Sequence, residues 1–225
     1  MKKMFTVAID GPAGSGKSST AKLVAKRLGY LFIDTGAMYR AVTLLAIRTG
    51  NLDNKEALLS LLPEYKITLK PGEDGNIVFL NDEDVSAAIR TEEINQNVSK
   101  ISSISEIRTE LVRMQQEMGK EGGVVMEGRD IGSVVFPDAD FKFFFTATVD
   151  ERAKRRLSEL QAQGAKMSFD EVRASIIRRD KYDSGREVSP LSKTDDAIEI
   201  DTTSMTLEQQ CDHIVKLVRE KEQLG

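Results

Sequence analysis

The sequence contains one cysteine, one histidine and no tryptophan among its 225 residues. A single cysteine, Cys211, cannot close an intramolecular disulfide, and no group of cysteine and histidine residues is present to bind zinc. No apolar run approaches the roughly 18 residues of a membrane span. The apolar stretch that follows the basic N-terminus ends at Asp10, too early for a secretory signal peptide. The sequence therefore predicts a protein of a reducing compartment, the cytoplasm.

An excess of charge of one sign is also lacking. The 32 basic and 36 acidic side chains give a formal net charge of −4, which offers no general reason to expect a nucleic-acid polymer as a partner. Residues 150–186 differ locally, because they carry 10 basic and 7 acidic side chains. A composition of 40% hydrophobic and 30% charged residues excludes a disordered or fibrous chain.

Alternating strand and helix patterns predict an α/β fold with one parallel sheet covered by helices. Short β-branched or aromatic runs mark the expected strands of this sheet at residues 6–10, 31–34, 124–127, 141–145 and 197–201. Helical spacing of apolar residues marks the expected helices at residues 17–28, 37–48, 91–100, 105–120, 150–160, 168–182 and 207–222. Residues 65–69 and 76–80 alternate like strands of a small antiparallel insert. We therefore expect one core with an appended lobe.

A glycine-rich segment with the pattern Gly11-x-x-x-x-Gly16-Lys17-Ser18 lies between the first expected strand and the first expected helix. This is the Walker A pattern in the context that supports it. The backbone N–H groups of such a loop and the following helix N-terminus point at phosphate oxygens. Lys17 is expected to reach the β- and γ-phosphates, and Ser18 to bind Mg²⁺. The pattern predicts a nucleoside triphosphate, and the absence of a guanine-reading motif disfavours a regulatory GTPase.

Three further polar clusters occur at residues 34–40, 127–132 and 178–186. Open α/β sheets bind ligands beyond the carboxyl ends of their strands, and Thr35 can cap a helix while Arg40 points back at an anion near that cap. Taken singly, each cluster could also be a capped helix start, a loop with a local ion pair or a solvated helix end. Beside a triphosphate site, Arg40, Arg129 and Arg186 together indicate a second phosphate-binding site.

A fourth cationic segment follows residue 150, where Arg152, Arg155 and Arg156 share one helical face. Such a face could belong to a flap that closes over transferring phosphate, or to an exposed basic helix. Cys211 and His213 lie in the last expected helix, far along the chain from every cluster. We expect both to be structural.

The chemistry that fits these clusters is phosphoryl transfer to a nucleoside monophosphate. The acceptor phosphate has a second pKa of about 6, so at neutral pH it is largely an anion and needs no general base. The reaction instead needs cations that hold two polyanions in line, and closure that excludes water.

The motifs at residues 11–18, 34–40, 127–132 and 179–186 resemble, in order and spacing, those of the bacterial cytidylate kinase family of P-loop nucleoside monophosphate kinases. The resemblance spans essentially the whole chain. It implies transfer of the γ-phosphate of ATP to CMP or dCMP with Mg²⁺. We also expect a monomer that binds no nucleic-acid polymer and no membrane. It further implies one kinase unit, with a core of residues 1–62 and 101–225, a monophosphate-binding lobe of residues 63–100 and an Arg-rich lid at about residues 150–167.

By matching position, the resemblance also implies a role for each motif residue. ATP would be bound by the phosphate loop and the lid, through Gly11, Pro12, Ala13, Gly14, Ser15, Gly16, Lys17, Ser18, Ser19, Arg152 and Arg156. The acceptor would be bound through Thr35, Arg40, Arg129 and Arg186 at the phosphate, through Ser99, Arg108 and Asp130 at the cytosine, and through Arg179 and Asp183 at the sugar. An aspartate suits cytosine because it can accept from the exocyclic amine that uracil lacks. Catalysis itself would depend on Lys17, Arg129 and Arg186.

Three rival interpretations remain open. Adenylate kinase has an acceptor motif similar to residues 35–40, although its Gly-Phe-Pro-Arg motif is missing here. A nucleotide-dependent binding switch would hydrolyse its nucleotide slowly, without stimulation by any monophosphate. A degenerate structural homologue is disfavoured, because Lys17, Ser18 and the candidate arginines are intact.

Overall fold

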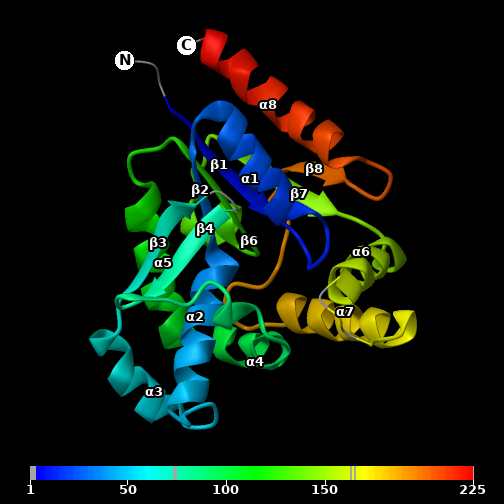
Figure 1. Cartoon of the computed structure of the whole chain (residues 1–225). Coiled ribbons are helices and arrows are strands. Elements are labelled where there is room, and N and C mark those ends of the chain that lie inside the picture. Colours follow the sequence, from blue (N-terminus) through cyan, green and yellow to red (C-terminus); the bar gives the residue numbers. More distant parts are fainter. Residues whose placement is uncertain (1–3, 73–74, 163, 165, 225) are drawn as a thin grey trace.

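The computed structural model describes residues 4–72, 75–162, 164 and 166–224. Its centre is a five-stranded sheet in the order β2-β6-β1-β7-β8 (Figure 1). The strands of this sheet are β1 (Thr6–Asp10), β2 (Leu31–Asp34), β6 (Val124–Gly128), β7 (Phe141–Thr146) and β8 (Ile198–Asp201). Every pairing within it is parallel. The predicted α/β fold with a parallel sheet is confirmed.

Helices cover both faces of the parallel sheet. The helices are α1 (Lys17–Leu28), α2 (Thr35–Arg48), α3 (Lys55–Leu61), α4 (Glu92–Ser102), α5 (Ser105–Gly119), α6 (Val149–Ala162), α7 (Phe169–Ser184) and α8 (Leu207–Leu224). Helices α1 and α8 pack on the face that carries Val7 and Ile9 of β1. Helix α5 and a π-helical turn, η3 (Ile131–Val135), pack on the opposite face, where Ala8 lies. Because successive residues of a strand point to opposite faces, β1 is buried on both sides.

A small antiparallel sheet, β3-β4-β5, stands beside the main one. Its strands are β3 (Ile67–Gly72), β4 (Gly75–Leu80) and β5 (Glu83–Asp84). Ile67 and Val78 share one buried cluster with residues of α2, α4 and α5, so the insert has no separate core of its own. The confirmed strands follow the predicted alternation, whereas α3 and β5 are short elements that the sequence did not predict.

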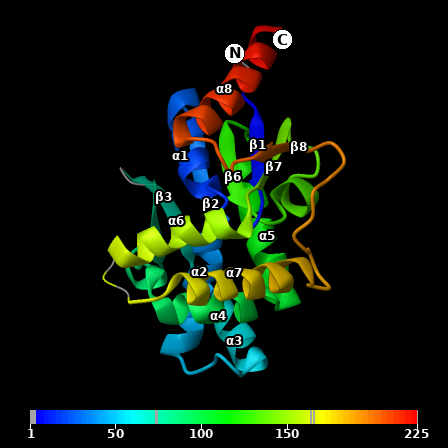
Figure 2. The same cartoon turned by 90° about the vertical axis from the view of Figure 1, so that its right-hand side faces the viewer.

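Helices α6 and α7 lie side by side in front of α2 and close to α4 (Figure 2). They pack together through Ala153, Leu160, Val172 and Ile176. Ser168 caps α7 in a capping box with Glu171, an arrangement that satisfies backbone N–H groups at the helix start. The pair is therefore held by its own small apolar core.

One local prediction was wrong. Helix α2 begins at Thr35, and its N-cap is Asp34, whose Oδ1 accepts from the backbone N–H of Ala37 at 3.0 Å. The hydroxyl of Thr35 instead donates to the carbonyl oxygen of Glu127 at 2.8 Å. Asp34 ends β2, so the turn into α2 places its carboxylate over the first-turn amides, and a charged acceptor binds these more strongly than a hydroxyl.

Cys211 and His213 lie on α8. Cys211 is buried in the core between α8 and α1, and burial raises the pKa of its thiol to about 11. His213 is exposed, and neither residue lines the cleft described below. Among the described residues, no helix combines the length and the apolar character needed to cross a membrane.

Candidate active site

The phosphate loop leaves β1 after Asp10 and enters α1 at Lys17. Gly11, with a φ of +146°, passes so close to β7 that a Cβ on it would lie 2.3 Å from the carbonyl oxygen of Phe145. Gly16 is the N-cap of α1 in a left-handed conformation, and it has no side chain that could accept from the first-turn N–H groups. The first turn of α1 also carries no acidic residue. The loop therefore presents backbone donors and a positive helix end to an anion.

Lys17 and Ser18 lie at the floor of this loop, beside the end of β6. Lys17 is buried, and its Nζ donates to the carbonyl oxygen of Pro12 at 2.8 Å. Burial, followed by the nearby charge of Arg129, lowers the pKa of Lys17 to about 7. Ser18 Oγ donates to Glu127 Oε1 at 2.6 Å, and burial raises the pKa of Glu127. The predicted phosphate and metal residues thus face a carboxylate that the sequence analysis did not assign.

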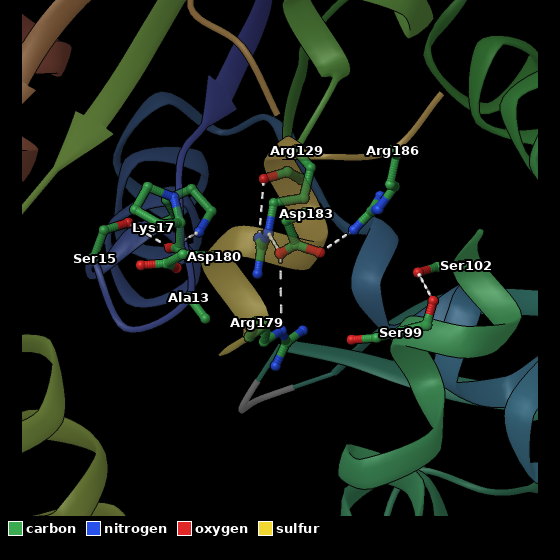
Figure 3. Close-up of polar contacts among 12 residues, drawn as sticks. Ala13, Ser15, Lys17, Ser99, Ser102, Arg129, Arg179, Asp180, Asp183 and Arg186 are labelled. Carbon is green, nitrogen blue, oxygen red and sulfur yellow. Dashed lines mark hydrogen bonds and ion pairs between the residues drawn. The ribbon is translucent and has the colours of Figure 1, made fainter. Parts of the chain in front are cut away.

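Three predicted arginines surround one buried aspartate, Asp183 (Figure 3). Arg129 Nε lies 2.8 Å from Asp183 Oδ2, Arg186 pairs with Oδ1, and Arg179 Nε lies 3.9 Å from Oδ2. Burial raises the pKa of Asp183, but the three guanidiniums outweigh that effect and hold it below its ordinary value. One carboxylate therefore balances three cations, which leaves excess positive charge for an anionic ligand.

Arg40 lies on the neighbouring side of the same site. Its guanidinium packs against Gly36, where an added Cβ would lie 2.9 Å from Arg40 Nη1. Burial lowers the pKa of Arg40, and Asp34 offsets part of that effect. Asp34 is shared, because Arg90 Nη2 donates to its Oδ2 at 3.0 Å. Arg90 comes from the turn η2 (Ala88–Arg90), so the insert contributes a cation that the sequence analysis did not assign.

The three residues predicted to read cytosine also come together. Arg108 and Asp130 are both buried and form an ion pair. Arg108 Nη1 donates to the carbonyl oxygen of Ser102 at 3.0 Å, and its guanidinium carbon lies 5.3 Å from the ring centroid of Tyr39. Ser99, one turn before Ser102 on α4, lines the same space. The arrangement offers a donor and an acceptor side by side in a pocket away from solvent.

A cleft of about 710 Å³ joins these parts. Every predicted site residue lines it except Gly11, Pro12, Ser15 and Arg152. Its lining also includes side chains whose Nε atoms are buried without a hydrogen-bond partner among the described residues, namely Arg40, Arg108, Arg179 and Arg186. Buried donors are almost always satisfied in folded proteins. Several unsatisfied donors around one cleft indicate a polar, anionic ligand.

The lid arginines separate into different environments. Arg152 is buried, and its guanidinium binds both carboxylate oxygens of Asp180 at 2.9 and 2.6 Å and the carbonyl oxygen of Ala13 at 3.2 Å. It therefore ties α6 to α7 and to the phosphate loop. Arg155 lines the cleft and also donates to the loop after β8. Arg156 lines the cleft and pairs with a neighbouring glutamate. Of the three arginines expected on one cationic face, two therefore line the cleft, and Arg152 supports the helix pair.

Comparison with known proteins assigns a family. The family model described as cytidylate kinase matches residues 7–220. A curated cytidylate kinase of Geobacillus sp. (strain WCH70) is 50% identical over 98% of this chain and 99% of its own length. One of Bacillus pumilus (strain SAFR-032) is 51% identical over 93% of each chain. A solved structure from Chloroflexus aurantiacus is 15% identical with a TM-score of 0.50, over 100% of this chain and 99% of that chain, and it supports the fold alone.

Proposed function

The chain belongs to the cytidylate kinase family and transfers the γ-phosphate of ATP to CMP, and we propose that the cleft between the phosphate loop and the insert is where it does so. The observation that carries this assignment is the convergence of Arg40, Arg129, Arg179 and Arg186 on one cleft with Lys17. These residues come from four separate segments of the chain. Lys17 is buried and the four arginines are partly buried, and a role on the open surface would not require them to line a common space.

On the donor side, we propose that the phosphate loop and Lys17 bind the β- and γ-phosphates of ATP. Lys17 is held over the loop by its bond to Pro12, and the positive end of α1 faces the same space. A phosphate near Lys17 would favour its charged form and so raise its pKa again. Arg156 reaches the cleft from α6 and would close over the triphosphate, while Arg152 would support the lid from behind through Asp180.

Mg²⁺ fits the side chains at the start of α1. Ser18 Oγ and the Glu127 carboxylate lie 2.6 Å apart, and both are the oxygen donors that Mg²⁺ prefers. We propose that Ser18 holds the ion and that Glu127 supports it through the same hydroxyl or a water molecule. When bound, Mg²⁺ would neutralise charge that develops on the β- and γ-phosphate oxygens.

On the acceptor side, we propose that the phosphate of CMP binds Arg40, Arg129 and Arg186, with Thr35 close by. The cytosine would lie against Ser99, Arg108 and Asp130, and the sugar hydroxyls against Arg179 and Asp183. The unsatisfied Nε atoms of Arg40 and Arg186 are donors that such a phosphate could accept from. No general base is required, because the attacking oxygen already carries charge at neutral pH.

The proposal also covers a second acceptor, the oligomeric state, the location, the partners and the domain division of the protein. We propose that dCMP serves as a second acceptor, that the enzyme acts as a monomer in the cytoplasm, and that it binds neither nucleic-acid polymers nor membranes. We further propose that residues 63–100 form a monophosphate-binding lobe inserted into a core of residues 1–62 and 101–225, and that about residues 150–167 form the lid.

An acceptor screen tests the proposed function directly. Coupled assays with ATP and Mg²⁺ should give rapid ADP formation with CMP, slower formation with UMP and almost none with AMP. Equal rates with AMP would instead favour an adenylate kinase. Slow hydrolysis that no monophosphate accelerates would favour a nucleotide-dependent switch.

Replacing Asp130 by asparagine is expected to weaken the preference for CMP over UMP by about tenfold or more, the effect of one specific buried hydrogen bond. Aspartate can only accept from a base, whereas an asparagine amide can also donate to the O4 atom of uracil. Asparagine keeps the volume of the side chain, so the buried Arg108 retains an oxygen partner. The measurement is kcat/KM for both acceptors, with the KM for ATP as the control. An unchanged CMP-to-UMP ratio would remove Asp130 from base recognition.

A further inference from the structure

Asp10 is a buried carboxylate that the phosphate-binding chemistry does not use. It is the last residue of β1, and only 6% of its surface is exposed. Oδ1 accepts from the backbone N–H of Ile131 at 2.8 Å, and Oδ2 accepts from that of Gly132 at 2.7 Å. The two partners lie more than 120 positions along the chain, so this contact depends entirely on the tertiary fold.

The two amides that Asp10 binds begin the π-helical turn η3. They follow directly after Arg129 and Asp130, the residues proposed to hold the acceptor phosphate and the cytosine. The N-cap residue of η3, Asp130, makes no side-chain cap of its own, because its carboxylate faces Arg108. Asp10 therefore supplies the cap of η3 from another strand, and π-helical turns are frequent at functional sites.

The close fit at Gly132 supports this interpretation. A Cβ on Gly132 would lie 3.4 Å from Asp10 Oδ2 and 3.2 Å from the side chain of Lys142. An added methyl group would therefore contact the carboxylate at an ordinary van der Waals distance, and the Lys142 side chain would have to shift slightly. The turn and the carboxylate are thus close neighbours in the packed interior.

A buried carboxylate at this position has an energetic cost. Burial raises the pKa of Asp10 to about 6, although the amides of Gly132 and Ile131 act in the opposite direction. Among nearby charges, Asp130 also raises that pKa and Lys17 lowers it. Asparagine would avoid the cost of burying a charge, but it has one acceptor oxygen, and its amide would face a backbone N–H. Only a carboxylate places an acceptor oxygen opposite each of the two amides.

We propose that Asp10 is a positioning residue for the acceptor nucleotide. By holding the amides of Ile131 and Gly132, it fixes the backbone that carries Arg129 and Asp130 relative to the phosphate loop, which starts at the next residue, Gly11. The β1–β6 pairing already places Asp10 opposite Gly128, and the carboxylate extends this connection to the residues that follow Asp130. The proposal rests on the proposed function of Arg129 and Asp130.

Asp10→Asn tests the proposal because it removes one acceptor and one charge at constant volume. The KM for CMP and the calorimetric Kd for CMP should rise about tenfold, the effect of losing one charge-assisted hydrogen bond. The Kd for a non-hydrolysable ATP analogue should stay within about twofold. Hydrogen exchange should accelerate in residues 130–135 and not in residues 11–18, a readout that does not depend on activity.

A matched control is Asp140→Asn. Asp140 Oδ2 also accepts from a backbone N–H of β1, that of Thr6 at 3.0 Å, but at the opposite end of the strand from the cleft. This variant should leave both nucleotide affinities unchanged. A wild-type protein that fails to phosphorylate CMP would refute the proposed function. The hydrogen-exchange pattern of Asp10→Asn would still show whether Asp10 holds the backbone of η3.

Two outcomes would overturn the proposal. Equal losses of affinity for the ATP analogue and for CMP would place Asp10 in the phosphate loop alone. Unchanged CMP affinity with unchanged exchange at residues 130–135 would show that the carboxylate positions nothing. If Asp10→Asn does not fold, Gly132→Val disturbs the same contact from the other side, because a side chain larger than a methyl group does not fit between Asp10 and Lys142. This variant should bind CMP more weakly and bind the ATP analogue with unchanged affinity. The reverse pattern would contradict a positioning role for Asp10.

Discussion

Replacing Lys17 by methionine is expected to lower kcat by at least about 100-fold, the range found when one preorganised donor to a transition state is removed. Lys17 donates to the turn of the phosphate loop at Pro12, and charge developing on the transferring group would lose this donor. Methionine fills similar space, so the main native contact that the variant loses is the hydrogen bond from Lys17 to Pro12. Single-turnover measurements with saturating ATP and CMP would separate chemistry from binding.

Lys26→Met is the control for this variant. Lys26 lies on the same helix, α1, and is exposed to solvent, so its replacement should leave kcat unchanged. A Lys17→Met enzyme that retains its rate within a few-fold would refute the assigned role.

The same variant should stabilise the nucleotide-free protein. Burial holds the pKa of Lys17 at about 7 in the folded chain, whereas an unfolded lysine titrates near 10.4. The unfolded state therefore binds more protons between these two values, and the wild-type protein gains stability from this group as pH rises through that window. The cost is complete below about pH 7, so the advantage of Lys17→Met in urea denaturation should be largest there and should shrink toward pH 10. An advantage that does not change with pH would contradict the burial cost.

The parts of the site that follow from sequence are those whose chemistry is confined to one short segment. The pattern from Gly11 to Ser18 combines a strand end, a tight glycine turn and a helix start, and each of these is visible in neighbouring residues. Arg179 and Asp183 likewise lie four residues apart in a segment of predicted helix, a spacing that puts side chains on one face, and the two side chains do approach each other. The parallel sheet followed from short strands separated by helices.

The parts that escaped prediction depend on contacts between distant segments. Asp10 was assigned only as the end of a strand, because nothing near it in sequence indicates the amides of Ile131 and Gly132. Arg90 and Glu127 were missed for the same reason, since their partners lie on β2 and on α1. One sequence signal was available for Glu127, because an acidic residue at the carboxyl end of a buried parallel strand can face the phosphate loop of a neighbouring strand.

Replacing Asp183 by asparagine is expected to reduce the free energy of unfolding by about 3 kcal/mol, the lower end of the cost of breaking a buried ion pair from one side. Asp183 is 2% exposed, and its loss would leave Arg129, Arg179 and Arg186 without their common counter-charge. Because its folded-state pKa is depressed, the contribution of Asp183 is complete above about pH 4 and is lost as pH falls through the folded value. Urea denaturation at pH 7 and at pH 3.5 would reveal this difference.

Asp53→Asn provides the comparison, because Asp53 has 91% of its side chain exposed and pairs only at the surface with Lys100. Its replacement should change stability by less than about 0.5 kcal/mol. The cluster around Asp183 also predicts a specific rescue. An anion that enters the cleft can replace part of the missing charge, so sulfate should stabilise Asp183→Asn more than the wild-type protein, while CMP binds the variant more weakly because a sugar contact is gone. Equal stabilisation of both proteins by sulfate would mean that the three guanidiniums do not share one anion site, and the assignment of Arg129 and Arg186 to the acceptor phosphate would then fail with it.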